Sequence, residues 1–317
     1  MDASFARSIH VSPATLKSLK GRSNLRGWIQ TGSHLGAIAL CSYALVNYWG
    51  SAWAIPLFCI QGILINCLYA GVHELSHKTV FKTEKLNEFF GRLFSFILLM
   101  GRDQDKFEHY QHHRHTQDVL LDAEIVGGKP FNIVSYLLYF SGISYWPGRI
   151  AEVFRLAVGQ TERWPHLSST QFKTVHKEAR IMLVLYAVIL LLSIALGSSA
   201  ALSYWILPML SMKWFHMLQN IVEHAGMPHE KEILVNTRTI KANPVMKWLF
   251  WNMPYHTAHH TYPMIPFFKL PELHKEIVAK LGSEPPTVSH LGFQKHMLRK
   301  LWQEGTSSYT GKDITTY

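Results

Sequence analysis

Two long stretches of this chain lack charged side chains. No Asp, Glu, Lys or Arg occurs between Arg26 and Glu74, or between Arg180 and Lys213. Because a membrane-spanning helix needs roughly 20 mostly apolar residues, each stretch is long enough for two helices and a turn. We predict four spans in two hairpins, at about 28–48 and 52–72, and at about 181–197 and 200–218. The alternative, very buried helices of a soluble protein, is disfavoured because such helices rarely need these lengths.

Cysteine is scarce, and other signals are missing. Cys41, Cys59 and Cys67 lie inside the predicted spans without metal-ligand spacing, so we interpret them as buried apolar residues. Residues 1–25 lack the short apolar core and cleavage site of a secretory signal, so no cleavable signal is expected. No basic stripe of a nucleic-acid-binding module occurs, and the net charge of +10 suits basic residues that face an anionic inner leaflet.

Charge is distributed unevenly around the predicted spans. The turns near Asn47–Ser51 and at 197–199 are uncharged, whereas basic residues precede the first and third spans: Lys17, Lys20, Arg22, Arg26, Lys177 and Arg180. The positive-inside rule then places the turns outside and both termini in the cytoplasm. We predict an all-α, multi-pass integral membrane protein. It is a single domain, 1–317, with a cytoplasmic helical cap at 73–180 and 219–304 and a polar tail at 305–317.

Histidine, in contrast, is abundant and clustered. Eight of the 19 histidines fall in three short boxes: His73-Glu-Leu-Ser-His77, His109-Tyr-Gln-His112-His113 and His256-Thr-Ala-His259-His260. On a helix, residues three or four apart share a face, and neutral imidazole is the commonest metal ligand. Because one zinc site takes three or four ligands, eight histidines are too many for one ion and about right for two. All three boxes fall on the cytoplasmic side of the predicted spans.

The end of the fourth predicted span adds a weaker signal. His216, Asn220 and His224 recur every four residues and share a stripe, and polar groups at membrane depth usually face a partner or a cavity. We interpret His224 as a metal ligand, with a hydrogen-bonded histidine at a helix end as the alternative. Asn220 lies one turn deeper and is expected to bind through water. His216 lies deepest and is expected to pack or to line a tunnel.

Several further residues near the boxes have two possible roles. His115 follows His113 by two residues and so points away from its helical face, which disfavours direct contact with a metal ion but leaves that role as the alternative. Four acidic residues either accept hydrogen bonds from the imidazoles or lie on solvated faces: Glu108, Asp118, Asp122 and Glu223. The remaining histidines stand singly and are expected to be surface or packing residues: His10, His34, His166, His176, His229, His274, His290 and His296.

Three local structures are also predicted around the boxes. Asp105 and Glu108 have the spacing of a capping box that starts the helix of the second box. The apolar segment Phe94–Met100 is too short to span and is expected to be interfacial or re-entrant. Residues 131–160 mix aromatics with scattered charges and are expected to form a helix on the membrane surface.

With these boxes, the chain resembles the membrane fatty acid desaturase and hydroxylase superfamily over roughly residues 28–280. The boxes read HELSH, HYQHH and HTAHH, flanked by HHRHTQD and YHTAHHTYPMIPFFKLPELH, and Asn220-x-x-x-His224 matches an Asn/His pair of acyl-CoA desaturases. The resemblance implies four spans, a cytoplasmic cap and a di-iron centre. It implies these ligands: His73, His77, His109, His112, His113, His224, His256, His259 and His260, with Asn220 in the outer shell. Glu74 and His115 are further candidates for the outer shell. The region around HELSH and QNIVEH looks closer to bacterial members, which implies a bacterial inner membrane.

The chain also departs from the acyl-CoA branch. The first box has three intervening residues where that branch usually has four, which weakens the transfer of an acyl-CoA substrate. No fused cytochrome b5 module occurs, so electrons are expected from a separate ferredoxin, rubredoxin or cytochrome b5 type protein and its reductase.

The function expected from the resemblance is O₂-dependent oxidation of an unactivated C–H position by two iron ions, since such chemistry is the province of iron or copper cofactors. An acyl or alkyl lipid is the expected substrate, and desaturation and hydroxylation both remain open. The alternative is hydroxylation or oxidative demethylation of a smaller polar metabolite. A remote alternative is a membrane zinc metalloprotease, because HELSH also fits H-E-x-x-H with Glu74 as general base. A metal transporter would need ligands near the bilayer midplane, whereas these histidines lie at the ends of the predicted spans, so this class is disfavoured.

Overall fold

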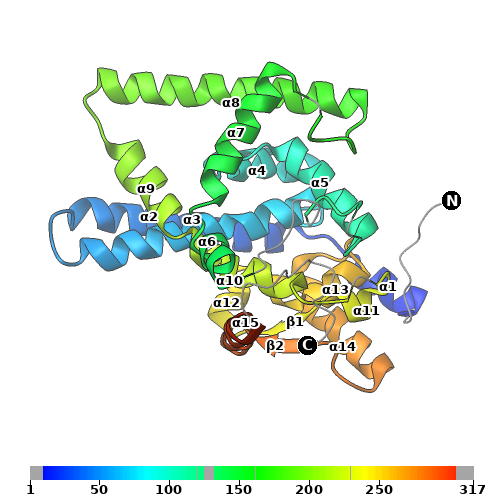
Figure 1. The fold of residues 1–317 in the computed structure, drawn as a ribbon. Helices are drawn as coiled ribbons and strands as arrows, with labels where there is room; N and C mark the ends of the chain where they lie inside the picture. Colours follow the sequence, from blue (N-terminus) through cyan, green and yellow to red (C-terminus); the bar gives the residue numbers. More distant parts are fainter. Residues whose placement is uncertain (1–9, 119, 125–131, 161, 229, 305–317) are drawn as a thin grey trace.

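A computed structural model describes residues 10–118, 120–124, 132–160, 162–228 and 230–304 (Figure 1), and most of them are helical. The elements are α1 (Pro13–Leu19), α2 (Asn24–Asn47), α3 (Ala54–Ser76), α4 (Glu84–Ile97), α5 (Arg102–His115), α6 (Ile133–Ser141), α7 (Tyr145–Val158), α8 (Ser169–Ala195), the π-helical η1 (Leu202–Ile206), α9 (Leu207–Ser211), α10 (Lys213–His224), α11 (Ile233–Asn236), β1 (Thr239–Lys241), α12 (Pro244–Leu249), η2 (Met253–Tyr255), α13 (His256–Thr261), η3 (Phe267–Lys269), α14 (Leu270–Leu281), β2 (Thr287–Ser289) and α15 (His290–Glu304).

The helix α3 is the centre of the molecule, with α2, α4, α9 and α10 packed around it. The buried Asn66 amide nitrogen donates to the Gly62 and Met209 carbonyls, both at 2.8 Å. Gly62 allows the close approach of α9, because a Cβ at this position would lie 2.1 Å from the Pro208 carbonyl oxygen. The first predicted hairpin is therefore present as α2 and α3, which lie side by side in Figure 1.

The second pair of predicted spans differs from the prediction. The helix α8 starts at Ser169, earlier than expected, because Ser168 and Gln171 form a capping box at its start. The fourth segment is not one helix, and η1, α9 and α10 succeed one another with breaks near Pro208 and Met212. Proline has no N–H and its ring clashes with the carbonyl four residues back, which the π-helical turn relieves. Among the described helices, α3 and α8 are long and apolar enough to cross a membrane, judged by length and composition.

The three local predictions have different outcomes. The capping box was wrong: the helix of the second box starts at Arg102 with Gly101 as its cap, and the Asp105 N–H, inside the first turn, donates to the Gly101 carbonyl. The segment 94–100 forms the partly buried end of α4 and the turn after it, and its place at the membrane interface stays a prediction. The single helix was also wrong. Residues 132–160 form two helices, α6 and α7, because the chain turns at Gly142 with φ +75°. Residues 125–131 lie outside the described part.

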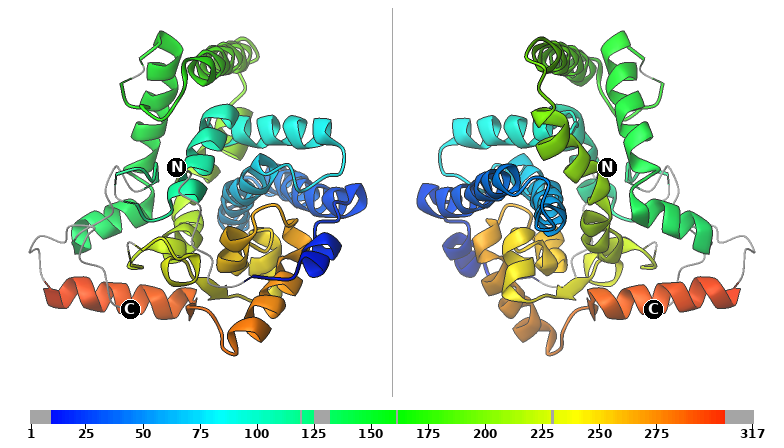
Figure 2. Two further views of the ribbon diagram at one scale, coloured as in Figure 1. Left: turned by 90° about the vertical axis from the view of Figure 1, so that its right-hand side faces the viewer. Right: turned by 90° about the vertical axis from the view of Figure 1, so that its left-hand side faces the viewer.

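The elements α11, β1, α14 and α15 pack against the histidine-bearing helices α10 and α13. The strands β1 and β2 pair in parallel, with Ile240 opposite Val288, so the described chain is mostly helical rather than all-α. In Figures 1 and 2 the helices α8 and α15 lie at opposite ends of the molecule, with α3, α5, α10 and α13 between them. These four central helices carry the three boxes and His224.

Candidate metal centre

The three histidine boxes and His224 meet in the interior as two groups of buried imidazoles. The five-histidine group consists of His73, His77, His109, His113 and His259, and the four-histidine group consists of His112, His224, His256 and His260. Within each group the nearest ring nitrogens all lie within 4.8 Å of one another. None of the nine side chains belongs to a residue that is more than 8% exposed. The structure therefore brings together all nine residues named from the sequence.

Each double-histidine box supplies both groups, in opposite ways. In His109-Tyr-Gln-His112-His113 on α5, the first and last histidines join the five-histidine group and the middle one joins the other. In His256-Thr-Ala-His259-His260 on α13, the first and last join the four-histidine group and the middle one crosses over. Consecutive helical residues point about 100° apart, so an adjacent histidine pair diverges toward two centres. The paired spacing thus encodes two sites rather than one.

The ring nitrogens face one another at distances that suit a shared cation. In the five-histidine group, the Nε2 of His259 lies 2.7 Å from that of His73 and 3.1 Å from that of His113. In the four-histidine group, the Nε2 of His224 lies 2.7 Å from that of His256 and 3.1 Å from that of His112. Ligand nitrogens at about 2.1 Å from one metal ion would lie about 3 Å apart when adjacent.

One buried nitrogen supports the fit directly. The Nε2 of His260 is buried and has no hydrogen-bond partner, although an unpaired buried polar atom costs free energy. A metal ion bound by the four-histidine group would satisfy it. Burial, followed by repulsion from neighbouring imidazoles, also holds the pKa of His113, His259 and His260 well below its usual range. The rings are therefore neutral at physiological pH, which is the form that binds metals.

The outward nitrogens of the four-histidine group face acceptors. The Nδ1 of His112 lies 2.9 Å from the Oδ1 of Asp122, and the same carboxylate accepts the Gln117 and Glu124 N–H groups. An acceptor at Nδ1 holds the proton there and leaves the Nε2 lone pair free for a metal. Asp122 thus has the supporting position considered from the sequence. The Oε1 of Glu223 lies near the Nδ1 of His256, at 3.5 Å, without forming a hydrogen bond with it.

Other supporting contacts could not be read from the sequence. The main-chain carbonyl of Asn236 lies 3.2 Å from the Nδ1 of His224. A pattern of side chains in the sequence cannot predict a main-chain acceptor. The Thr116 hydroxyl lies 3.3 Å from the Nδ1 of His260, and the Oε1 of Glu124 lies 3.9 Å from the Nδ1 of His109.

Two acidic residues weighed from the sequence take different roles. Glu108 accepts from the Trp164 indole at 3.1 Å. Asp118 accepts the N–H groups of Leu120 and Leu121. Neither side chain has a hydrogen bond or ion pair with a histidine of the two groups.

Glu74, between the two histidines of the first box, also lies behind a ring. Its Oε1 is 3.2 Å from the Nδ1 of His259, and its Oε2 accepts from the Thr79 hydroxyl at 3.2 Å. Both Glu74 and His259 are fully buried. The carboxylate therefore supports a histidine of the five-histidine group from the side that faces away from the other rings.

The remaining residues named beside the ligands lie outside both groups. Asn220 accepts from the Tyr139 hydroxyl at 2.9 Å, and His115 is the half-buried last residue of α5. His216 is buried, with its Nδ1 2.9 Å from the Lys213 ammonium and its ring against Tyr69, in keeping with a packing role.

The single histidines lie away from the two groups. His34 is a buried packing residue that bonds the Leu64 carbonyl and the Trp251 indole. His290 contacts the Gln219 amide and His274 contacts Glu284. His229 lies outside the described residues.

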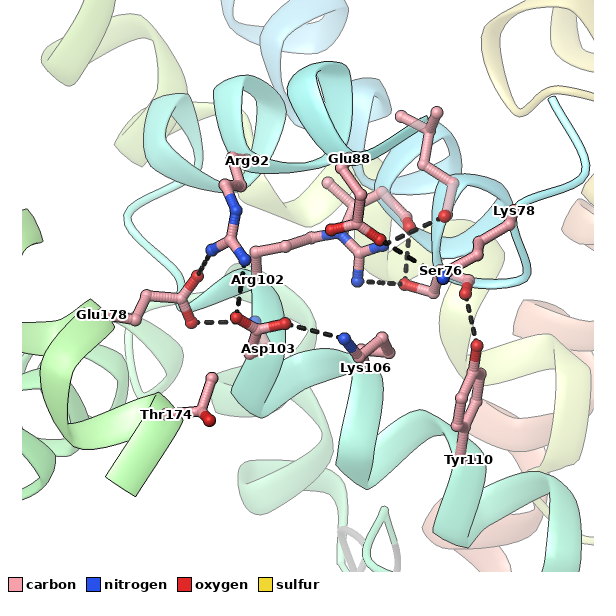
Figure 3. A network of polar contacts seen from close by, with 12 residues as sticks. Ser76, Lys78, Glu88, Arg92, Arg102, Asp103, Lys106, Tyr110, Thr174 and Glu178 are labelled. Atoms are coloured by element: carbon pink, nitrogen blue, oxygen red, sulfur yellow. Dashed lines mark hydrogen bonds and ion pairs between the residues drawn. The ribbon is translucent and has the colours of Figure 1, made fainter. Parts of the chain in front are cut away.

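A buried arginine ties the helices of the first two boxes together (Figure 3). The Arg102 guanidinium, 1% exposed, donates to the Leu75 carbonyl at 3.0 Å and the Ser76 hydroxyl at 3.2 Å. This end of α3 lies between the two histidines of the first box. The neighbouring Asp103 pairs with Arg92 at 2.8 Å and Lys106 at 2.7 Å. Gly91 makes room for Arg102, since a Cβ there would lie 2.3 Å from its Nε.

A cavity of about 240 Å³ adjoins the five-histidine group at His109. Its walls come from α3, α5, α6, α7 and α10 and the segment after α5, and they include Asp105, Glu108, Glu124 and three tyrosines. Burial raises the pKa of Asp105 to about 7, and burial together with the nearby Glu152 raises that of Glu108. Two larger grooves are mostly apolar and lie along α8, one of about 900 Å³ against α4 and one of about 700 Å³ toward η1.

Comparison with known families identifies the fold that carries this centre. The family model described as fatty acid desaturase matches residues 6–292. The chain belongs to the fatty acid desaturase family. Membership supports an oxidoreductase with a metal site built from the histidine boxes, and the resemblance seen in the boxes is confirmed. A search of curated proteins finds none that matches this chain.

The carboxylate behind His112 gives a first testable prediction. Asp122→Asn should weaken metal binding by about 10- to 100-fold, the usual effect of losing the acceptor behind a metal-bound imidazole. A competition titration with a metal chelator measures the change. Asp118→Asn is the matched control, because Asp118 lies four residues away and its side chain accepts only from the Leu120 and Leu121 N–H groups among the described residues. Equal metal affinity in both variants would show that Asp122 does not support a ligand.

Proposed function

We propose that this protein is a membrane-embedded, non-haem di-iron oxidoreductase that uses O₂ to desaturate or hydroxylate an unactivated C–H position of an acyl or alkyl substrate. The observation that carries the proposal is the division of nine buried, converging histidines into two groups of five and four. Neither zinc protease chemistry nor a single metal ion explains two adjacent groups.

The number and type of ligands favour iron. Zinc sites are almost always four-coordinate, so the five-histidine group exceeds what zinc takes. Imidazole suits iron as well as zinc and copper, and oxidation of unactivated C–H bonds requires iron or copper cofactors. We assign the five-histidine group to one iron ion and the four-histidine group to the other. All nine assigned ligands are those implied by the resemblance.

The chain itself would orient the ions and keep water away. Bound iron ions would supply the O₂-dependent oxidation of the C–H bond. Asp122 holds the Nδ1 proton of His112, which fixes its Nε2 lone pair toward the four-histidine group. The Glu74 carboxylate lies 3.2 Å from the Nδ1 of His259, on the side away from the other rings. The helices around the centre leave these rings at most 8% exposed, which limits side reactions with water. Electrons would come from a separate ferredoxin, rubredoxin or cytochrome b5 type protein and its reductase.

The apolar surface of α8 supports the membrane part of the proposal. Only 11% of its apolar window is buried, compared with 56% for α3. Leu190, Leu191 and Ile194 are each more than 60% exposed, and such a patch marks a membrane or protein contact. We propose four membrane segments, α2, α3, α8 and the broken helix η1–α9, with the histidine centre and both termini in the cytoplasm of a bacterium.

A smaller polar metabolite is the second candidate substrate. The cavity beside His109 has acidic and tyrosine walls, whereas neither of the two apolar grooves along α8 has a histidine of the two groups among its lining residues. A polar molecule, or the polar end of a lipid, therefore fits closest to the centre.

Two measurements test the proposal together. Elemental analysis of anaerobically purified protein should find about two irons per chain, because two ligand groups are present. Expression with a reductase and its ferredoxin, followed by untargeted mass spectrometry, should show a product that has gained one oxygen or lost two hydrogens. One tightly bound zinc ion and no iron would contradict the proposal and favour the protease.

Glu74→Gln separates the same two classes. A protease would lose its general base and all activity, because Glu74 is the only acid of H-E-x-x-H. A di-iron enzyme should keep both irons and part of its turnover, because glutamine still offers an oxygen acceptor to the Nδ1 of His259, now 3.2 Å from Glu74. Iron content and oxygen-dependent product formation measure the outcome. Complete loss of turnover with full iron content would contradict a purely supporting role.

A further inference from the structure

The small cavity beside His109 is lined by more carboxyl groups than guanidinium or ammonium groups. Among the described residues that line it are three carboxyl groups, Asp105, Glu108 and Glu124, and one guanidinium group, Arg149. Carboxylates are rarely buried unless they are paired. A bound positive charge would resolve this excess.

Asp105 is the carboxylate without a partner. The residue is 8% exposed and lies on the cavity wall, one helical turn before His109 on α5. Its side chain has no hydrogen bond and no ion pair within the described part of the chain. A buried polar group in this state costs free energy unless a ligand or water pairs with it.

The nearby cations are engaged elsewhere. Arg149 donates to the Oε2 of Glu152 at 2.7 Å and to the Gln104 amide oxygen at 3.4 Å. The ammonium of Lys213 lies 2.9 Å from the Nδ1 of His216 and forms no ion pair with a described carboxylate. Neither one therefore pairs with Asp105.

The other walls are aromatic, and a side-chain nitrogen lies over two of them. Tyr69, Tyr139 and Tyr145 line the cavity. The Nζ of Lys213 lies 3.8 Å from the centre of the Tyr145 ring and 5.8 Å from that of Tyr69. Aromatic faces attract cations, and groups of such rings recognise quaternary ammonium ligands. The cavity thus combines carboxylates and aromatic rings, the two features that bind an alkylated ammonium group.

We propose that this cavity binds the quaternary ammonium group of the substrate and so anchors it beside the five-histidine group. The volume of about 240 Å³ lies below the roughly 300 Å³ at which pockets for drug-sized ligands begin, so it suits a small molecule or a headgroup. His109 belongs both to the cavity wall and to the five-histidine group. That the bound molecule is oxidised rests on the proposed function, whereas its binding does not.

Binding of choline tests the charge of the ligand. The iron-loaded protein in phosphatidylglycerol nanodiscs is titrated calorimetrically with choline and with 3,3-dimethylbutan-1-ol, which has the same shape without the charge. Choline should bind at least 10-fold more tightly, a difference of about 1.4 kcal/mol. Asp105→Asn should reduce choline affinity at least 10-fold, and Glu162→Gln, which removes an exposed carboxylate outside the cavity, should leave it unchanged.

A second arm distinguishes a free metabolite from a lipid. Lysophosphatidylcholine presents the same ammonium group on a lipid, and lysophosphatidylglycerol is its control. Binding of choline identifies a small metabolite as a sufficient ligand, and binding of lysophosphatidylcholine alone identifies a headgroup. Equal affinity for choline and its neutral analogue, with no preference between the two lipids, would overturn the proposal. Iron content measured on the same sample keeps this failure separate from a failure of the di-iron assignment.

Discussion

Replacing His259 by alanine should remove iron from the five-histidine group and lower turnover by more than about 100-fold, beyond the effect of losing a supporting residue. The Nε2 of His259 lies 2.7 Å from that of His73 and 3.1 Å from that of His113, so this ring faces two other rings of its group. Its loss would also leave Glu74 without its imidazole partner in a fully buried position. Iron per chain and product formation measure the two effects.

The two groups should respond separately to substitution. His260→Ala should release the ion of the four-histidine group and leave about one iron per chain, because His260 belongs to that group alone. Turnover should be lost in both variants, since the proposed reaction uses both ions. His290→Ala and His166→Ala are controls, as both residues lie outside the groups. If the controls lost as much iron as the two variants, the ligand assignment would be wrong.

Arg102→Met should destabilise the protein by about 2–4 kcal/mol and lower its iron content. The guanidinium is buried and donates to Leu75 and Ser76, so its removal leaves a buried carbonyl and hydroxyl without these donors. The end of α3 would then lose its link to α5, and His73 and His77 would no longer be held against His109. Thermal unfolding in detergent and iron analysis measure the two losses.

Arg92→Met is the matched control for Arg102. The Arg92 side chain is 52% exposed, although it pairs with Asp103 and Glu178. The two carboxylates are nearly buried, but each keeps a second partner: Asp103 keeps Lys106, and Glu178 keeps the Asp103 N–H. This variant should therefore keep its iron and lose less stability than Arg102→Met. A loss as large as that of Arg102→Met would show that surface charge, rather than the buried link, holds the two boxes together.

The ligand histidines could be named from the sequence because their spacing is local. Residues three or four apart share a helical face in any fold, so each box could be recognised from its spacing alone. The sequence signal for His224 was weaker, because His224 lies in none of the three boxes. It could be named only from its place at the end of a predicted span and its four-residue spacing from Asn220. Which histidines share an ion could not be predicted, because that depends on how α5 and α13 are rotated toward each other.

The errors in the predicted fold have the same origin. The first hairpin was predictable from one long uncharged stretch with a turn near Asn47–Ser51. The broken fourth segment and the two helices at 132–160 depend on Pro208 and Gly142, whose effects were outweighed in the sequence by the surrounding apolar residues. The capping box at Asp105 failed because Gly101, four residues earlier, is the N-cap of the helix.

The sequence by itself determined the family, the apolar segments and the nine converging histidines, since these depend on residue type and spacing along one chain. Only the tertiary structure decided the division into five and four, the place of Glu74 behind His259, and the cavity that leaves Asp105 unpaired. Each of these involves side chains from different helices, whose distances are set by packing around α3. Contacts between distant helices have no fixed spacing along the chain, so no local sequence pattern could have predicted them.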